Sequence, residues 1–214
     1  MKFLEPSLLA FDKEKIEDQL NDVKNAGAKY IHYDVMDGKF VPNKALGTEY
    51  IKLINKLDMK VCVHVMVYKV LKYFKEFSKF KIYSFSFHPE ACKNIKQALK
   101  IMQIIKNAGI LAGIVINPDT SCIAYEELIK AADMVTVMGV FPGKCGQKFI
   151  PNSIENLKFV KNIKDTYNKK IIITLDGGVR ESIIKDTKKY VDHFVSGSFL
   201  TSAKNKQAIF DLVK

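Results

Sequence analysis

The stretch YIHYDVMDGKFVPN, residues 30 to 43, decides the fold prediction. Its first half has the alternating pattern of a β-strand, which places His32 and Asp34 on the same face of that strand. The strand is predicted to break into a loop at Asp37 and Gly38. An imidazole beside a carboxylate can bind a divalent metal, and a carboxylate can also move a proton. Functional side chains at the end of a strand are typical of α/β barrels.

The rest of the chain repeats this pairing of a strand with a loop and a helix. Runs rich in Val, Ile and aromatic residues predict strands near residues 3–9, 29–35, 60–66, 81–87, 111–116, 133–139, 170–175 and 191–196. Lysine-rich patterns predict helices at 13–26, 47–56, 69–77, 91–107, 122–130, 152–166, 180–188 and 203–213. Eight alternating units imply an α/β fold with a parallel sheet, closed into a (β/α)8 TIM barrel. A doubly wound open sheet is the alternative.

The tetrapeptide KNAG occurs twice, at residues 24–27 and 106–109. Each copy precedes a predicted strand, and each glycine lies where a helix would end in a left-handed cap. The repeat is consistent with duplication of the βα unit. The length of 214 residues suits one barrel, so we expect a single domain over residues 1–214.

The composition is that of a globular protein, with 48% hydrophobic and 27% charged residues. The formal net charge is +11, but Arg180 is the only arginine, and the lysines are scattered instead of massed in one arm. Base readout and phosphate clamps favour arginine, so we expect no nucleic-acid partner. A mild attraction for anionic phosphorylated substrates is compatible with this charge.

The cysteines and the apolar segments bear on the cellular compartment. Cys62, Cys92, Cys122 and Cys145 have neither a C-x-x-C pair nor zinc-ribbon spacing, and we interpret them as free thiols in a reducing compartment. We recognise no signal peptide and no apolar run of membrane-spanning length. We therefore expect a cytoplasmic protein without a membrane partner.

Histidines and carboxylates gather at the predicted carboxyl ends of the strands. Four of them form a candidate metal-ligand set: His32, Asp34, His64 and Asp176. Nitrogen and oxygen ligands without a thiolate suit Zn, Mn, Fe or Co. Taken singly, a strand histidine is more often a hydrogen-bonded core residue, but the convergence of several strands favours a metal site. His88 is either a fifth neighbour or a turn residue.

Glycines follow the late strands, where barrels commonly bind phosphate through backbone N–H groups. The candidates are Gly177, Gly178, Gly197 and Ser198. Gly143 and Gly146 could complete the same phosphate-binding site from the loop after the sixth strand. Three methionines, Met36, Met66 and Met138, lie at or near the ends of three strands. They are either core residues or an apolar lining that keeps the reacting centre dry.

Together these segments resemble the ribulose-phosphate 3-epimerase family. The motifs that carry the resemblance are PSLLAFD at 6–12, HYDVMDGKFVPN at 32–43, VHVM at 63–66, HPEA at 88–91, GIVINPDT at 113–120, MGVFPGKCGQKF at 138–149, LDGGV at 175–179 and VSGS at 195–198. They span nearly the whole chain in the right order. The resemblance implies a (β/α)8 barrel and an enzyme that interconverts D-ribulose 5-phosphate and D-xylulose 5-phosphate through an enediolate.

The resemblance also implies roles for individual residues. One divalent ion, Zn, Fe, Mn or Co, would bind His32, Asp34, His64 and Asp176, with no organic cofactor. Asp34 and Asp176 would be the two acid/base groups. The substrate would contact Ser7 and His64 through its sugar, and Gly143, Lys144, Cys145, Gly146, Gly177, Gly178, Gly197 and Ser198 through its phosphate. The three methionines would flank the planar intermediate. The substrate would be a phosphorylated ketopentose, and the chain would form a homo-oligomer.

Two departures from the family pattern bear on the site. The family usually has aspartate at the position of Cys62, so we expect the loss of a carboxylate that orients a metal ligand. Lys144 and Cys145 replace residues of the phosphate loop, and the backbone freedom of glycine is lost at position 145. The alternatives are an epimerase of a related, for example six-carbon, ketose phosphate, a barrel lyase, or a degenerate phosphosugar-binding protein.

Overall fold

Eight parallel strands form the centre of the structure, a computed structural model that describes residues 2–214. They are β1 (Phe3–Pro6), β2 (Tyr30–Asp37), β4 (Lys60–Met66), β5 (Ser84–Phe87), β6 (Leu111–Ile116), β7 (Met134–Met138), β8 (Ile172–Asp176) and β9 (His193–Ser196). Hydrogen bonds join them in the order β1-β9-β8-β7-β6-β5-β4-β2. A parallel bridge between Ser7 and His32 closes the ring, which confirms the predicted barrel against the open sheet.

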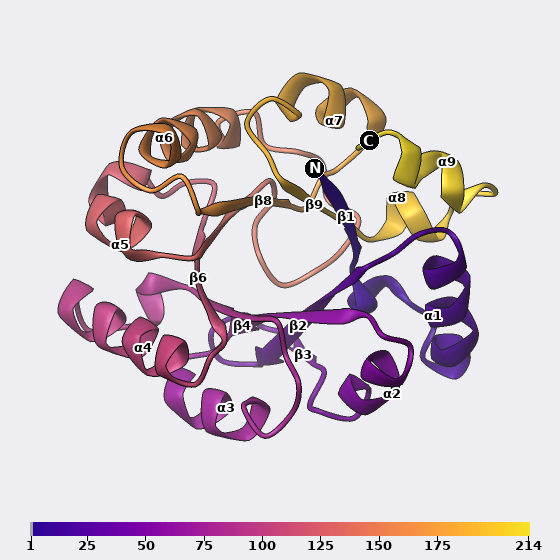
Figure 1. Cartoon of the computed structure of the whole chain (residues 1–214), viewed down its shortest axis with the longest axis horizontal. Helices are drawn as coiled ribbons and strands as arrows, with labels where there is room; N and C mark the ends of the chain where they lie inside the picture. The colour runs from indigo at the N-terminus through magenta and orange to yellow at the C-terminus, as the bar shows by residue number, and fades with distance from the viewer. Residues whose placement is uncertain (1) are drawn as a thin grey trace.

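Helices surround the strands on the outside of the ring (Figure 1). They are α1 (Ile16–Asn25), α2 (Ile51–Lys56), α3 (Val70–Phe77), α4 (Ile95–Asn107), α5 (Glu126–Ala131), α6 (Ser153–Thr166), α7 (Glu181–Thr187), α8 (Ser198–Thr201) and α9 (Lys206–Asp211). Four short 3-10 helices accompany them: η1 (Leu8–Ala10), η2 (Lys13–Lys15), η3 (Pro89–Ala91) and η4 (Cys122–Tyr125). The strand–helix alternation predicted from the sequence is therefore present along the chain.

Several elements differ from the prediction. The strand predicted at 3–9 ends at Pro6 and is followed by η1, and the helix predicted at 47–56 begins at Ile51. The helix expected at 203–213 is shorter and is preceded by α8, which begins directly after β9. A two-residue strand, β3 (Lys44–Ala45), pairs antiparallel with the end of β2 and extends that strand to Asp37. Asp37 then turns the chain, because its carboxylate accepts hydrogen bonds from the backbone N–H groups of Lys39 and Phe40.

Local sequence signals explain where the helices begin and end. In α4, the Asn94 side chain accepts a hydrogen bond from the Gln97 N–H, as an N-cap does. The chain leaves α4 through Gly109, whose φ is +74°, and it leaves α1 through Gly27, whose φ is +108°. Both glycines of the KNAG repeat thus adopt the left-handed conformation that the sequence predicts.

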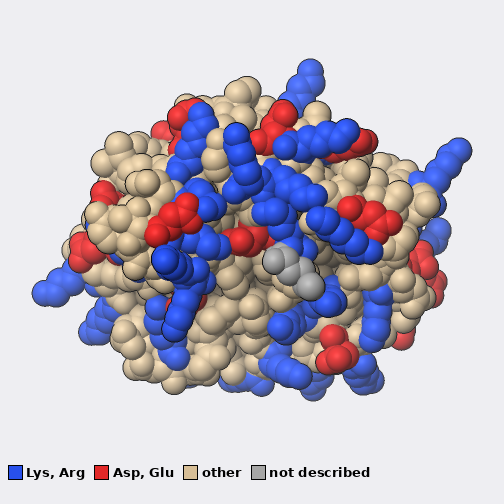
Figure 2. All heavy atoms as spheres, turned by 45° about the horizontal axis from the view of Figure 1, so that its top comes forward, with Lys and Arg blue, Asp and Glu red and all other residues tan. Residues whose placement is uncertain are grey.

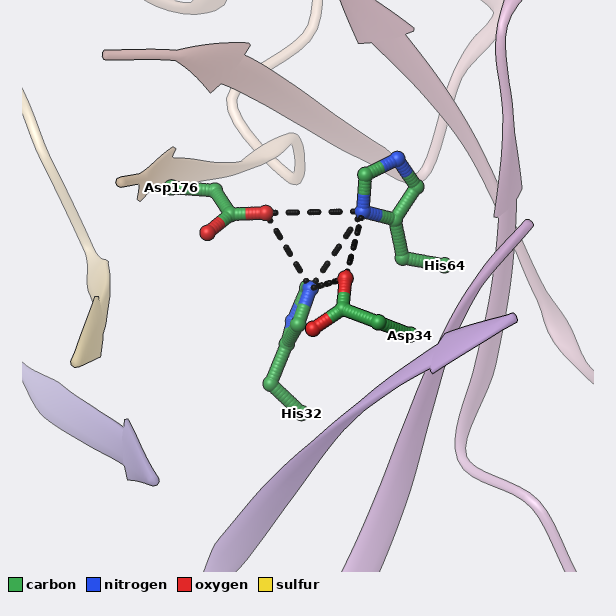
Figure 3. Close-up of side chains that lie close together, drawn as sticks. All are labelled: His32, Asp34, His64 and Asp176. Carbon is green, nitrogen blue, oxygen red and sulfur yellow. Dashed lines mark hydrogen bonds and ion pairs between the residues drawn. The ribbon is translucent and has the colours of Figure 1, made fainter. Parts of the chain in front are cut away.

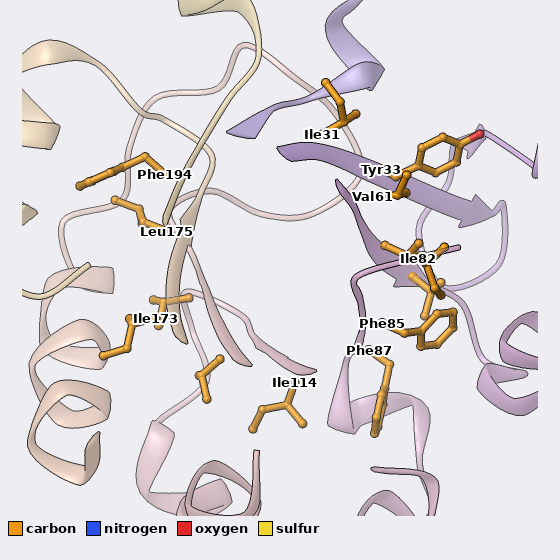
Figure 4. Packing of buried hydrophobic residues seen from close by; sticks show 14 of the residues in the cluster. Ile31, Tyr33, Val61, Ile82, Phe85, Phe87, Ile114, Ile173, Leu175 and Phe194 are labelled. Atoms are coloured by element: carbon orange, nitrogen blue, oxygen red, sulfur yellow. The ribbon is translucent and has the colours of Figure 1, made fainter. Parts of the chain in front are cut away.

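The main core lies between the outer face of the ring and the helices (Figure 4). Alternate strand residues such as Ile31, Phe85, Leu175 and Phe194 point outward into it and are fully buried. Burial of one such side chain stabilises the fold by about 1.5–3 kcal/mol. The residues between them point into the ring, so this outer core fixes the positions of the inner side chains.

The strand register aligns the inner side chains at the carboxyl ends. Asp34 of β2 pairs with His64 of β4, and Met36 pairs with Met66. Across the ring, Met138 of β7 pairs with Asp176 of β8. These pairings bring residues that are far apart in the sequence to one level of the barrel.

The surface carries lysines over much of the face drawn in Figure 2, with carboxylates between them. Many lysines form local ion pairs, for example Lys161 with Asp165 and Lys185 with Glu181. Exposed pairs of this kind contribute little to stability, because water and salt screen them. Within residues 2–214, no helix is both long enough and apolar enough to cross a membrane.

Candidate functional site

Four side chains converge inside the ring, at the carboxyl ends of β2, β4 and β8 (Figure 3). Nε2 of His32 lies 3.3 Å from Oδ1 of Asp34 and 3.2 Å from Oδ2 of Asp176. Nδ1 of His64 lies 3.1 Å and 3.4 Å from the same two oxygens. The two imidazole nitrogens are 3.4 Å apart. This is the set predicted from the sequence, brought together by three strands.

The spacing of these atoms fits a small divalent cation. In a tetrahedral site with metal–ligand bonds of about 2.0–2.2 Å, neighbouring ligand atoms lie roughly 3.3–3.6 Å apart. The five distances that involve a histidine nitrogen are 3.1–3.4 Å, and all four ligand atoms lie within 4.8 Å of one another. All four residues are buried, so their charges are only weakly screened by solvent. The donor set of two nitrogens and two oxygens is one that Zn, Fe, Mn or Co accepts.

Electrostatics in the cluster favour a cation between the carboxylates. Burial opposes the charged form of Asp34, but His32 and His64 hold the pKa of that carboxyl well below its usual value. The pKa of Asp176 is lowered in the same way, against burial, by His32 and then His64. Burial favours neutral His32, yet Asp34 and Asp176 raise its pKa well above its usual value. Protons on the imidazoles therefore balance the carboxylates, and a metal ion can replace them.

Further polar contacts position two members of the cluster, Asp34 and His64. Oγ of Ser7 donates to Oδ2 of Asp34 at 3.0 Å. Nε2 of His64 lies 2.9 Å from Nε2 of the buried His88, and burial followed by the proximity of His64 lowers the pKa of His88 well below its usual value. A neutral His88 can accept the N–H at Nε2 of His64, while Nδ1 of His64 faces the cluster. His88 is thus a neighbour of a candidate ligand, one of the two roles weighed from the sequence.

A single cavity at the mouth of the barrel collects the other predicted residues. Its lining includes every predicted site residue except His32, which lies beneath it: Ser7, Asp34, Met36, His64, Met66, Met138, Gly143, Lys144, Cys145, Gly146, Asp176, Gly177, Gly178, Gly197 and Ser198. The three methionines are at most 5% exposed and form part of its apolar wall. A polar centre and an apolar wall thus share one cavity.

Backbone conformation shapes the glycine-rich side of the cavity. Gly177 and Gly178 have positive φ values of +91° and +69°. A Cβ atom on Gly178 would lie 2.7 Å from the Cα atom of Phe149, so the loops after β7 and β8 touch only because residue 178 is glycine. The side chain of Asn43, in the loop after β2, donates to the carbonyl oxygen of Gly143 at 2.8 Å. This hydrogen bond joins the loop after β2 to the loop after β7.

Comparison with known proteins is decisive about the family. A family model described as the ribulose-phosphate 3 epimerase family matches residues 3–201. The chain belongs to the ribulose-phosphate 3-epimerase family. A ribulose-phosphate 3-epimerase of Aquifex aeolicus is 40% identical over 210 residues, which cover 97% of this chain and 93% of that protein. One from Bacillus subtilis is 36% identical over 178 residues, covering 82% and 81%.

Solved structures support the fold. The tryptophan synthase of Mycobacterium tuberculosis superposes with a TM-score of 0.69 at 14% identity, covering 99% of this chain and 91% of that one. A mutant tryptophan synthase alpha-subunit from Pyrococcus furiosus gives a TM-score of 0.64 at 16% identity, with 99% and 96% covered. At this identity the likeness shows a shared fold only.

The departures from the epimerase family pattern are accommodated locally. Position 62 carries a thiol and no carboxylate, but Oε2 of Glu5 lies 3.3 Å from Nδ1 of His32. A carboxylate from another strand thus lies beside His32. In the loop after β7, positive φ occurs at Gly143 and Gly146 but not at Cys145, so the missing glycine at 145 imposes no strain.

The sequence interpretation missed two residues near the site. Glu5 is a charged residue in a strand of otherwise apolar residues, on the same face as Ser7, and that alternation was the available signal. Arg180 lines the cavity directly after LDGGV and is the only arginine of the chain. Its position next to a predicted phosphate-binding stretch would have identified it.

Proposed function

We propose that this chain interconverts D-ribulose 5-phosphate and D-xylulose 5-phosphate, with Asp34 and Asp176 as its acid/base pair. The observation that supports this most directly is the pair of carboxylates, held in one cavity by His32 and His64. Membership of the epimerase family supports the substrate class. Both curated relatives described above are ribulose-phosphate 3-epimerases.

The reaction inverts C3 next to the C2 ketone and needs two proton transfers. One aspartate removes the C3 proton, and the electrons spread onto the C2 oxygen as an enediolate. The other aspartate, protonated, returns a proton to C3 from the opposite face. Asp34 and Asp176 come from strands separated in the ring by β1 and β9, so they approach the cavity from different directions. Their roles exchange in the reverse reaction.

We propose one divalent metal, Zn, Fe, Mn or Co, as the only cofactor. His32, Asp34, His64 and Asp176 would hold it, since their donor atoms have the spacing and chemistry described above. When bound, such an ion supplies Lewis-acid stabilisation of negative charge that develops at the C2 oxygen. The raised pKa values of both histidines fit ligands that exchange a proton for a cation.

Substrate binding would divide between the two sides of the cavity. Ser7 and His64 would contact the sugar, and the three methionines would exclude water from the planar intermediate. Backbone N–H groups of the glycine-rich loops would bind the phosphate. The proposed residues are Gly143, Lys144, Cys145, Gly146, Gly177, Gly178, Gly197 and Ser198. A cytoplasmic location and a homo-oligomeric assembly stay predictions from the sequence.

A metal-reconstitution assay tests the proposal. Purified protein is stripped with a chelator, reloaded separately with Zn, Fe, Mn or Co, and assayed on both pentose phosphates in D2O. We expect turnover with at least one metal and deuterium at C3 of the product, because the acid/base pair exchanges protons with solvent. Turnover without deuterium incorporation would contradict a proton-transfer mechanism.

Two other outcomes would favour the alternative functions. Higher kcat/KM on a six-carbon ketose phosphate would reassign the substrate. Metal binding without turnover would favour a phosphosugar-binding protein.

A pair of matched variants assigns the aspartates. Asp34→Asn should lower kcat by about 10²–10⁴-fold, since an amide cannot accept the proton. Asp119→Asn is the control, because Asp119 is exposed and does not line the cavity. Near-normal epimerisation by Asp34→Asn would remove Asp34 from the mechanism.

A further inference from the structure

A buried carboxylate lies on the far side of His32 from the cavity. Glu5 is fully buried, and its Oε2 atom is 3.3 Å from Nδ1 of His32. Its Oε1 atom is 2.5 Å from Nδ1 of His193 and 3.6 Å from Sγ of Cys62. One side chain from β1 therefore joins groups of β9, β2 and β4, across the seam where the ring closes.

Glu5 has no route to the substrate. Neither Glu5, His193 nor His32 lines the cavity, and all three are at most 3% exposed. Glu5 therefore cannot act on the reacting carbon. A buried carboxylate costs free energy unless donors surround it, and here two imidazoles and a thiol surround it within the barrel. Its contacts are the only route by which it can influence the site.

The contact with His32 determines which ring nitrogen carries the proton. A neutral imidazole has one N–H, and a carboxylate at Nδ1 places that hydrogen on Nδ1. Nε2 then presents its lone pair toward Asp34 and Asp176, where the candidate ion would bind. The carboxylate also limits rotation of the ring and makes Nε2 a stronger metal ligand.

His193 holds the carboxylate in this position. Its Nδ1–H donates to Oε1 of Glu5. Oε1 therefore has a hydrogen-bond partner, and Oε2 stays directed at His32. The other candidate histidine ligand, His64, has a different partner, since its Nε2 contacts the imidazole of His88 instead of a carboxylate. Among residues 2–214, the two candidate histidine ligands are thus supported by different chemistry.

We propose that Glu5, held by His193, is a positioning residue that fixes Nε2 of His32 toward the cluster and so strengthens binding of the divalent metal. The inference rests on the metal site of the proposed function. It assigns Glu5 no contact with the substrate. Loss of such a carboxylate behind a histidine ligand typically weakens metal affinity by 10–100-fold.

The first test measures metal affinity directly. Stripped wild type and Glu5→Gln are titrated with Co²⁺ and Zn²⁺ against a competing chelator, and the Co²⁺ visible spectrum reports the ligand geometry. Glutamine keeps the side-chain size but cannot accept both N–H groups, so we expect about 10–100-fold weaker binding and an altered Co²⁺ spectrum. Equal affinity and identical spectra would overturn the proposal. Failure of wild type to bind either metal would instead refute the metal site itself.

A control separates this effect from general damage to the barrel interior. Thr174 of β8 is buried, and its hydroxyl has no hydrogen-bond partner. Thr174→Val keeps its size and removes no contact with the cluster, so its metal affinity should match wild type. An equal loss in Thr174→Val and Glu5→Gln would show that any interior change disturbs the site, and would count against a specific role for Glu5.

A relocated carboxylate gives a test that does not depend on the fold of Glu5→Gln. Cys62 pairs with His32 in the register of β2 and β4, and its sulfur lies beside Glu5. In the double variant Glu5→Ala with Cys62→Asp, the new carboxylate lies next to the same imidazole. Recovery of metal affinity to within about threefold of wild type, against weak binding by Glu5→Ala, would support the proposal. No recovery in a folded double variant would contradict it.

Discussion

The two sides of the cavity are built by different means. One side is the cluster of candidate metal ligands, four buried side chains on β2, β4 and β8. Their positions follow from the strand register and the outer core. The glycine-rich side consists of loops whose half-buried backbone is shaped by positive φ angles, as at Gly143 and Gly178. The first side depends on the chemistry of particular side chains, whereas the second depends on the absence of side chains. Substitutions should therefore affect the two sides differently.

Among the changes that contrast the two sides, the largest effect should come from Asp176→Asn. Asparagine keeps the size but cannot carry the proton or the negative charge, so we expect kcat to fall by about 10³-fold, with metal affinity reduced as well. Steady-state assays and chelator competition on the same protein measure the two losses. If kcat changed less than fivefold, the buried cluster would not be the reacting centre, and the distinction between the two sides would fail.

Acid should weaken metal binding by the cluster. His32 and His64 have raised pKa values, so below those values each carries a proton that metal binding must displace. Metal affinity should therefore fall as pH falls, by up to about tenfold per pH unit for each proton displaced, and level off above both pKa values. Metal titration at a series of pH values measures the slope. A flat profile through the acid range would contradict histidine ligation.

The sequence predicted much of the cluster because strand periodicity is a strong signal. His32 and Asp34 lie two residues apart on one strand, and Asp176 ends another, so each could be placed at the carboxyl end without coordinates. Only the barrel geometry, however, shows that the nitrogens of His32 and His64 lie 3.1–3.4 Å from both carboxylates. Pairing of distant strands sets that spacing, and local patterns do not determine it.

Glu5 shows why contacts across the ring could not be predicted. Its contact with His193 joins residues 188 positions apart, and that contact exists only because β1 pairs with β9. The loop after β7 is a second example. Gly143 and Gly146 adopt the positive φ angles of this loop, so Cys145 does not have to. Element types and faces follow from local sequence, but contacts across the ring depend on closure of the barrel.

A glycine substitution should disturb the loop side with less effect on the chemistry. Gly178→Ala requires φ near +69° and puts Cβ 2.7 Å from backbone of Phe149, so the loops must separate. We expect KM for the phosphorylated substrate to rise about tenfold and the free energy of unfolding to fall by about 1–3 kcal/mol. Gly109→Ala is the matched control, since Gly109 does not line the cavity, its Cβ would meet nothing within 4 Å and only the strain of its φ, +74°, remains. An equal rise in KM in Gly109→Ala would show that contact between the loops is unimportant.

The smallest effect should come from Lys144→Ala. Lys144 is an exposed side chain in the loop after β7, and no ion pair forms between it and any carboxylate of residues 2–214. If the loop binds phosphate through its backbone, removal of this charge takes away only a screened long-range attraction. KM should then rise less than threefold at physiological salt, with kcat unchanged and a weaker dependence of KM on salt. A tenfold rise in KM would mean that a side chain contributes directly to phosphate binding, and the contrast between a side-chain cluster and a backbone cup would no longer hold.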